Sequence, residues 1–291
     1  MNTPEASTDL KGKALSEQRF KIFQSIAEEL SGEVTFPTSF DVVVRLRKAL
    51  QDEAQTLDHI AMLLSTEPLI PVRLVQLANS AAFNRCREVK EIKEAINRLG
   101  LNTVRTQSMA IAMSQLLRSK EMVVFGDLPH KIWNHSLRTA CAAFVLCRRM
   151  TRTQPDEGLL AGMVHDLGAF FLLYRFRQYE DLVMRQNSVK HLLARWHESI
   201  THSLLISLGI PDDIADAVRD HDLRRPVPEK PANLTDVIYI SNLLAGGMAD
   251  WLCLDEFTAE SIEDVEQARG LYQAHLEEID AFEQEMRHAL D

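Results

Sequence analysis

The sequence has few of the residues that interrupt helices and few of the patterns that build sheets. Its 291 residues include only 11 glycines and 10 prolines. Alternating runs rich in valine, isoleucine and threonine, which are typical of half-buried strands, are scarce. Amphipathic stretches with a repeat near 3.6 residues are common instead. The sequence therefore predicts an all-α protein.

Cysteine pairs and long apolar runs are also missing. The four cysteines form no CxxC pair, and Cys141 and Cys147 lie in an apolar helical stretch, which indicates buried thiols of a reducing compartment. The first residues contain no apolar core of a signal peptide. We see no apolar run that approaches the ~20 residues needed to span a bilayer. We therefore expect a cytoplasmic protein without a membrane partner.

The charge balance limits the kinds of partner. The formal net charge is −10, whereas nucleic-acid binding depends on clustered Lys and Arg side chains that neutralise phosphates. No helix has a clearly basic face. The sequence therefore disfavours a nucleic-acid partner.

Helical periodicity divides the chain into four parts. Gly100 ends one helix, and residues 101–117 form the next. The apolar stripe of the last, acidic helix favours packing on its own domain, and pairing with a second copy in a homodimer is the alternative. The four parts are an N-terminal extension with one helix (1–35), an N-terminal helical subdomain (36–120), a helical core (121–250) and the acidic C-terminal helix (251–291).

One stretch, residues 155–169, places His165 directly beside Asp166 at the end of an apolar helix. An imidazole and a carboxylate are costly to bury without partners. A divalent cation would take both as ligands. A hydrogen-bonded pair at a helix C-terminus is the alternative interpretation of these two residues alone.

Further polar residues follow on successive helices, and their order resembles that of the HD superfamily of metal-dependent phosphohydrolases. A closer resemblance is to the HDOD domain, the HD-related output domain of bacterial signalling proteins. The segments that resemble it are DHIAMLLSTEPLIPVRLVQLANSAAF (58–83), EAINRLGLNTVR (94–105), IWNHSLRTA (132–140), EGLLAGMVHDLG (157–168), HESITHSLLISLGIPDDIADAVRDH (197–221) and VIYISNLLA (237–245).

The resemblance implies a multi-helical HDOD fold, in which an N-terminal bundle of about five helices packs on an HD-type helical core. It also implies a role in signalling, and one or two divalent ions (Fe, Mn, Mg, Zn or Ni). Asp222 stands where two-metal members often have a second histidine, and Asn242 replaces a final aspartate. The ligands that the resemblance implies are His135, His165, Asp166, His202 and His221, with Asp222 and Asn242 as weaker ones.

Three departures from the HD pattern bear on catalysis. Asn242 is neutral and a weaker ligand than aspartate, Lys131 stands where cleaving members have a glutamate, and Ala169 stands where they have a lysine. In an active centre Asp166 would bridge two ions, and an activated water would attack a phosphate. The departures favour metal binding without efficient hydrolysis.

Two functional hypotheses follow. The first is a signalling or regulatory protein that acts mainly by binding a protein partner and holds a divalent metal. The second is a phosphohydrolase that acts on a nucleotide or phosphate ester, with Asp166 at its centre.

Nearby polar residues receive simpler interpretations. His191 and His197 are expected on the solvent side of their helix. Glu198 shares a helix face with His202 and either orients that imidazole or is solvated. Asn79 is expected to bind backbone between helices.

Overall fold

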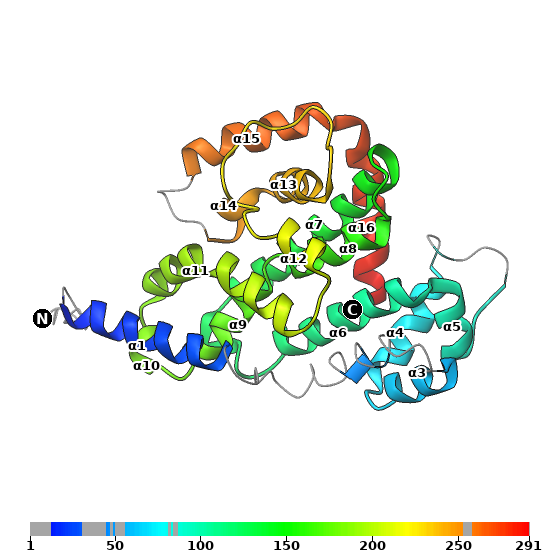
Figure 1. Ribbon diagram of the computed structural model, residues 1–291, viewed down its shortest axis with the longest axis horizontal. Helices are drawn as coiled ribbons and strands as arrows, with labels where there is room; N and C mark the ends of the chain where they lie inside the picture. Colours follow the sequence, from blue (N-terminus) through cyan, green and yellow to red (C-terminus); the bar gives the residue numbers. More distant parts are fainter. Residues whose placement is uncertain are drawn as a thin grey trace, which may run out of the picture.

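The computed structural model describes residues 13–30, 45–46, 49, 56–80, 83, 87–252 and 258–290. Within these residues every regular element is a helix, which confirms the predicted all-α class (Figure 1). In chain order they are α1 (Lys13–Leu30), α3 (Leu57–Leu64), α4 (Leu69–Ala78), α5 (Ile92–Leu99), α6 (Leu101–Leu117), the 3-10 turn η2 (Val123–Phe125), α7 (Leu128–Met150), α8 (Pro155–Val164), α9 (Leu167–Phe176), α10 (Glu180–Val183), α11 (Gln186–Ser207), α12 (Asp212–Ala217), α13 (Leu234–Leu244), α14 (Gly247–Leu252), α15 (Thr258–Leu271) and α16 (Gln273–Leu290).

Helices α3 to α6 lie in the range predicted for the N-terminal subdomain, and α4 and α5 both pack on α6. Gly100 separates α5 from α6 and has a φ of 79°, a conformation that favours glycine. Asn79 binds the backbone of Val89 twice: its amide donates to the carbonyl at 2.8 Å, and its oxygen accepts from the N–H at 2.8 Å. The predicted structural role of Asn79 is confirmed.

The first helix lies away from this subdomain. Figure 1 shows α1 at the opposite end of the molecule from α3, α4 and α5. It contacts α11, where the rings of Phe23 and Trp196 are 5.3 Å apart between centroids. Helix α1 is therefore an addition to the core rather than to the N-terminal bundle.

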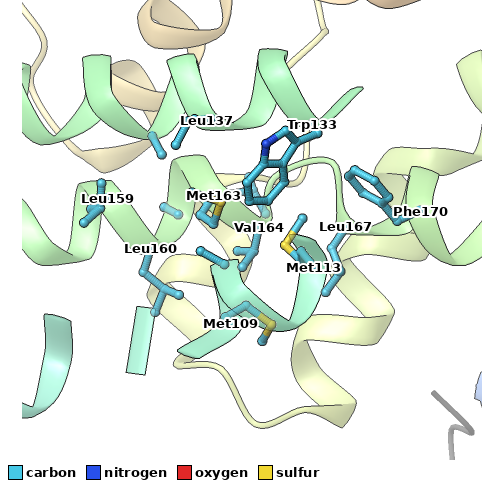
Figure 2. Close-up of a cluster of buried hydrophobic side chains, with 14 of the residues drawn as sticks. Met109, Met113, Trp133, Leu137, Leu159, Leu160, Met163, Val164, Leu167 and Phe170 are labelled. Atoms are coloured by element: carbon cyan, nitrogen blue, oxygen red, sulfur yellow. The ribbon is translucent and has the colours of Figure 1, made fainter. Parts of the chain in front are cut away.

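The core is organised on the crossing of α7 and α8, whose backbones come close because small residues face each other. A Cβ atom on Gly162 would lie 2.5 Å from the Cα atom of Ala140, and one on Gly158 would lie 2.8 Å from the carbonyl oxygen of Ala143. Figure 2 shows the apolar cluster beside this crossing, where Met109 and Met113 of α6 meet side chains of α7, α8 and α9. The crossing fixes the spacing between His135 on α7 and His165 after α8.

The expectation that no apolar run approaches membrane-spanning length was wrong. Residues 155–176, which comprise α8 and α9, are 22 residues long and apolar enough to cross a bilayer by length and composition. However, 89% of the most apolar window is buried inside the fold. The apolar character of this segment therefore reflects its position at the centre of the core.

The C-terminal region contains two helices rather than the one predicted. The helical run breaks at Tyr272, whose hydroxyl donates to the carbonyl oxygen of Pro228 at 2.6 Å. Helix α16 packs along α7, where Phe282 stacks on Phe144 with ring centroids 4.4 Å apart. Its apolar stripe is thus buried within its own chain, as the sequence favoured. The homodimer stays a prediction and would need another surface.

Charged side chains reinforce this packing of α16. The Arg138 guanidinium on α7 lies 2.6 Å from a carboxylate oxygen of Glu283 and 2.9 Å from one of Asp280. The acidity of the last helix is therefore matched, in part, by basic residues of the core.

Two of the four cysteines lie in described parts of the core. Cys141 and Cys147 are free and buried, as predicted. Burial raises the pKa of the Cys147 thiol to about 11, which makes it unreactive at neutral pH. Cys86 and Cys253 lie outside the described residues.

The α7–α8 crossing can be tested with two glycine substitutions. We expect Gly162→Ala to lower the free energy of unfolding by about 1–3 kcal/mol or more, because the new methyl overlaps the Ala140 backbone. Gly270→Ala on α15 is the control, since a Cβ there meets nothing within 4 Å. Urea denaturation of both variants measures the difference. Equal stabilities would show that the crossing tolerates the methyl.

Candidate metal centre

Four core segments bring the polar side chains predicted from the sequence to one buried point. His135 comes from the N-terminal half of α7, and His165 and Asp166 occupy the turn between α8 and α9. His221 lies in the turn after α12, and each of these four side chains is at most 2% exposed. Asn242 on α13 is also buried there. The structure therefore brings together most of the residues that the sequence singled out.

The carboxylate of Asp166 lies at the centre of this group. Its Oδ2 atom is 3.3 Å from Nε2 of His165 and 3.8 Å from Nε2 of His135. Its Oδ1 atom is 3.3 Å from Nε2 of His221 and 3.5 Å from Nε2 of His197. We call the first set the His135 position (His135, His165 and Asp166 Oδ2) and the second the His221 position (His197, His221 and Asp166 Oδ1).

Hydrogen bonds to backbone orient three of the four imidazoles. Each Nδ1 atom lies 2.8–2.9 Å from a carbonyl oxygen three or four residues earlier. A proton on Nδ1 leaves the Nε2 lone pair directed at Asp166, which is the tautomer that binds metal. The pairs are His165 with Gly162, His197 with Leu193 and His221 with Val218.

Several buried atoms of the centre have no hydrogen-bond partner among the described residues. They include Nε2 of His165, both carboxylate oxygens of Asp166 and Oδ2 of Asp222. Such atoms are costly to bury unless something else binds them. Donor atoms bound to one ion at about 2.1 Å are themselves about 3.0–3.4 Å apart, close to the spacings seen here. The residues thus fit one or two divalent ions, with Asp166 shared between the two positions.

Burial and the neighbouring charges shift the pKa values in opposite directions. Burial lowers the pKa of His165 to about 3. Burial also disfavours the charged form of His221, but the carboxylates of Asp222 and Asp166 outweigh it and raise the pKa of His221 to about 10. In the same way, the surrounding imidazoles hold the pKa of Asp166 below its usual range despite its burial. Without a metal the centre holds a proton on His221, and metal binding would release it.

The prediction for α11 has to be corrected. His202 points away from the centre: its Nε2 atom lies 3.3 Å from Oδ1 of Asp216, and its side chain is 27% exposed. His197, expected on the solvent side, is fully buried at the His221 position. Five residues of helix turn the side chain by more than a third of a circle, so only one of the two can face Asp166. The sequence feature that could have indicated the burial of His197 is the apolar face that it shares with Ile200 and Leu204.

The remaining polar residues support the His221 position. Glu198 does not orient His202; its Oε1 atom accepts the backbone N–H of Asp222 at 3.0 Å and lies 3.9 Å from Nδ1 of His221. Burial raises the pKa of Glu198. Oδ2 of Asp222 lies 3.1 Å from Nε2 of His197. Asp222 therefore adds a second carboxylate to this position.

Gly168 brings the start of α9 into close contact with α11 next to the centre. Its N–H donates to the hydroxyl of Thr201 at 2.8 Å, and a Cβ on it would lie 2.3 Å from the carbonyl oxygen of His197. Only glycine allows this approach, which sets the position of His197 relative to Asp166.

The sequence pattern of the HDOD domain family matches residues 36–223 of the chain. The chain belongs to the HDOD family. This match covers more than half of the chain and includes the N-terminal subdomain and every residue of the centre except Asn242. The HDOD fold predicted from the resemblance is thereby confirmed.

Solved structures of other proteins are similar to this chain in fold. A crystal structure from Shewanella amazonensis, provisionally named a metal-dependent phosphohydrolase, is 19% identical with a TM-score of 0.70 over 95% of this HDOD chain and 100% of that one. A structure from Marinobacter aquaeolei, provisionally named a signal transduction protein, is 18% identical with a TM-score of 0.53 over 97% of this chain and 68% of that one. At these identities the likeness shows the fold.

A curated relative is longer than the HDOD chain. An uncharacterized protein of Treponema pallidum is 22% identical in a match 240 residues long that covers 78% of this chain and 44% of that protein. The chain thus spans less than half the length of this relative.

The two histidines of α11 provide a matched test of the centre. We expect His197→Ala to lose divalent-metal binding and His202→Ala to keep it, because only His197 faces Asp166. A bound ion at 100 times its dissociation constant stabilises by about 2.7 kcal/mol, which raises Tm by about 5–10 °C for a domain of this size. Thermal unfolding with and without manganese measures the shift. Equal shifts of Tm with manganese in both variants would show that His197 is not a ligand of the metal.

The pH dependence of the metal-free protein follows mainly from two buried histidines, His221 and His165, and the pKa of His197 is raised in the same direction as that of His221. The folded pKa of His221 is about 10 against 6.5 unfolded, so its stabilising contribution is complete below pH 6.5 and is lost as pH rises towards 10. The folded pKa of His165 is about 3, so the unfolded chain binds a proton first and stability falls as pH drops below 6.5.

We therefore expect the chelator-treated protein to be most stable at about pH 6–7. Thermal unfolding from pH 5 to pH 9 measures this profile. His221→Gln should reduce the alkaline loss, of which His197 keeps a part because Asp222 and Asp166 also raise its pKa against its burial, and should leave the acid loss. An alkaline loss of the same size in this variant would assign the proton to another group.

Proposed function

We propose that this chain is an HDOD signalling or regulatory protein that acts mainly by binding a protein partner, with a divalent-metal centre that holds its core together. The observation that supports this most directly is the closure of the centre. The donor imidazoles of His135, His165, His197 and His221 are 0–1% exposed, and so is the carboxylate of Asp166. Structural metal sites are closed, whereas catalytic sites keep a position open to substrate.

A closed centre has a clear physical role in this fold. Its ligands come from α7, the α8–α9 turn, α11 and the turn after α12. An ion at the His221 position would link the last three of these segments, and an ion at the His135 position would link α7 to the α8–α9 turn. Metal binding to such a set is coupled to folding, because the unfolded chain does not hold the donors together. The partner-binding surface would then be presented by a core whose rigidity depends on the metal.

The residues around the centre also favour binding over hydrolysis. Lys131, one helical turn before His135, is exposed and has no lone pair for a metal when protonated. Ala169 is fully buried and has no charge to offer a phosphate. The family and its bacterial relatives support a cytoplasmic signalling protein of a bacterium.

A second candidate function is hydrolysis of a nucleotide or phosphate ester. It is favoured by the sharing of Asp166 between two positions, which is the arrangement of a two-metal centre. The provisional name of the Shewanella amazonensis structure points the same way. When bound, divalent ions would supply Lewis-acid chemistry. Asp166 would hold them together, and the helices that cover the donors would have to part for a substrate to reach them.

Elemental analysis and turnover together separate the two functions. We expect the purified protein to contain stoichiometric divalent metal, and the His165→Ala, Asp166→Ala double variant to contain none. With added manganese or iron, hydrolysis of a nucleotide and phosphodiester panel should not exceed that of the double variant. Metal-dependent turnover present only in the unaltered protein would favour the phosphohydrolase. Absence of metal from both proteins would reject the centre itself.

A further inference from the structure

Asn242 makes three polar contacts inside the centre, and two of them require a carboxamide. Its Nδ2 atom donates to Oδ1 of Asp222 at 2.8 Å and to the backbone oxygen of His221 at 3.1 Å. Its Oδ1 atom lies 2.9 Å from Nε2 of His135. An aspartate at this place has no N–H to donate and would repel Asp222.

We propose that Asn242 makes the centre asymmetric, so that one divalent ion binds tightly at the His221 position while the His135 position binds at least tenfold more weakly. This inference rests on the metal centre proposed above. Asn242 is a positioning residue in this proposal: it acts through Asp222 and His135.

The His221 position has the geometry of a complete site. Nε2 of His197, Nε2 of His221 and Oδ1 of Asp166 are 3.3, 3.4 and 3.5 Å from one another, a nearly equilateral triangle. Oδ2 of Asp222 lies 3.1 Å and 3.6 Å from the two imidazole nitrogens. It is a fourth donor.

Asn242 orients this fourth donor. By donating to Oδ1 of Asp222, it fixes the carboxylate and leaves Oδ2 buried without a hydrogen-bond partner among the described residues. Partners that orient a ligand in this way typically change metal affinity by about 10–100-fold.

The tautomers of the histidines point to the same asymmetry. His197 and His221 each have a backbone carbonyl that accepts Nδ1–H, so both can keep a proton there and bind the ion through Nε2. His135 instead faces the Oδ1 acceptor of Asn242 with Nε2, and its Nδ1 atom has no partner among the described residues. An imidazole that faces an acceptor presents N–H there. To bind metal through Nε2, His135 would have to move its proton to a buried Nδ1 without an acceptor.

The charges reinforce this difference. The His221 position has two carboxylates, Asp166 and Asp222, to balance a divalent ion. The His135 position shares Asp166 and has a neutral carboxamide in place of a second carboxylate. A second ion at the His135 position would be repelled by the first, and no further anion there would offset this repulsion.

Titration of chelator-stripped protein with manganese(II), followed by calorimetry and elemental analysis, tests the proposal. The unaltered protein should bind one equivalent tightly. His135→Ala should keep that equivalent within about tenfold of its affinity, whereas His197→Ala should lose at least about 100-fold. Asn242→Asp should weaken the first ion by about 10–100-fold and raise the stoichiometry towards two, because it removes the donor to Asp222 and adds a carboxylate beside His135.

The outcomes separate failure of this inference from failure of the metal centre. Two equivalents of similar affinity in the unaltered protein, or equal losses in His135→Ala and His197→Ala, would overturn the asymmetry and leave the centre in place. No binding by any protein would overturn both. If His135→Ala does not fold, as judged by circular dichroism, His135→Gln replaces it and carries the same expectation.

Discussion

The carboxylate of Asp166, buried among four imidazoles, is the constraint on which the rest of the core depends. Its two oxygens lie within 3.8 Å of Nε2 atoms from α7, the α8–α9 turn, α11 and the turn after α12. A charge in such a place is unfavourable unless oppositely charged groups or a metal surround it. The close crossing at Gly162 and the approach of Gly168 to α11 are what allow these segments to meet. The packing of these helices therefore determines where the carboxylate of Asp166 lies relative to the imidazoles.

Local signals in the sequence predicted much of this arrangement. Gly100 ends a helix because its backbone adopts a positive φ, and Asn79 binds backbone as its residue type suggests. His165 and Asp166 stand out because an adjacent imidazole and carboxylate after an apolar helix need a partner. The family resemblance then supplied His135 and His221, and the structure places both beside Asp166.

Features that depend on tertiary contacts were harder to predict. The choice between His197 and His202 depends on the rotation of α11 about its axis, which the contact of Thr201 on α11 with distant Gly168 sets. The break at Tyr272 has no proline, and a hydrogen bond to distant Pro228 accompanies it. The apolar length of α8 and α9 was underestimated because His165 and Asp166 interrupt it. In the first two cases the deciding partner is remote in sequence, whereas in the third the interruption lies within the segment itself.

The burial of the donors has a consequence for how the protein would acquire its ion. Atoms that are closed off in the folded core exchange with solvent only when helices separate, and such openings are rare in the most stable parts of a protein. Exchange of the ion with the folded protein would then be slow, and until it is complete metal availability during folding would matter as much as the equilibrium order of affinities. The metal content of each molecule would be a record of the conditions under which it was made.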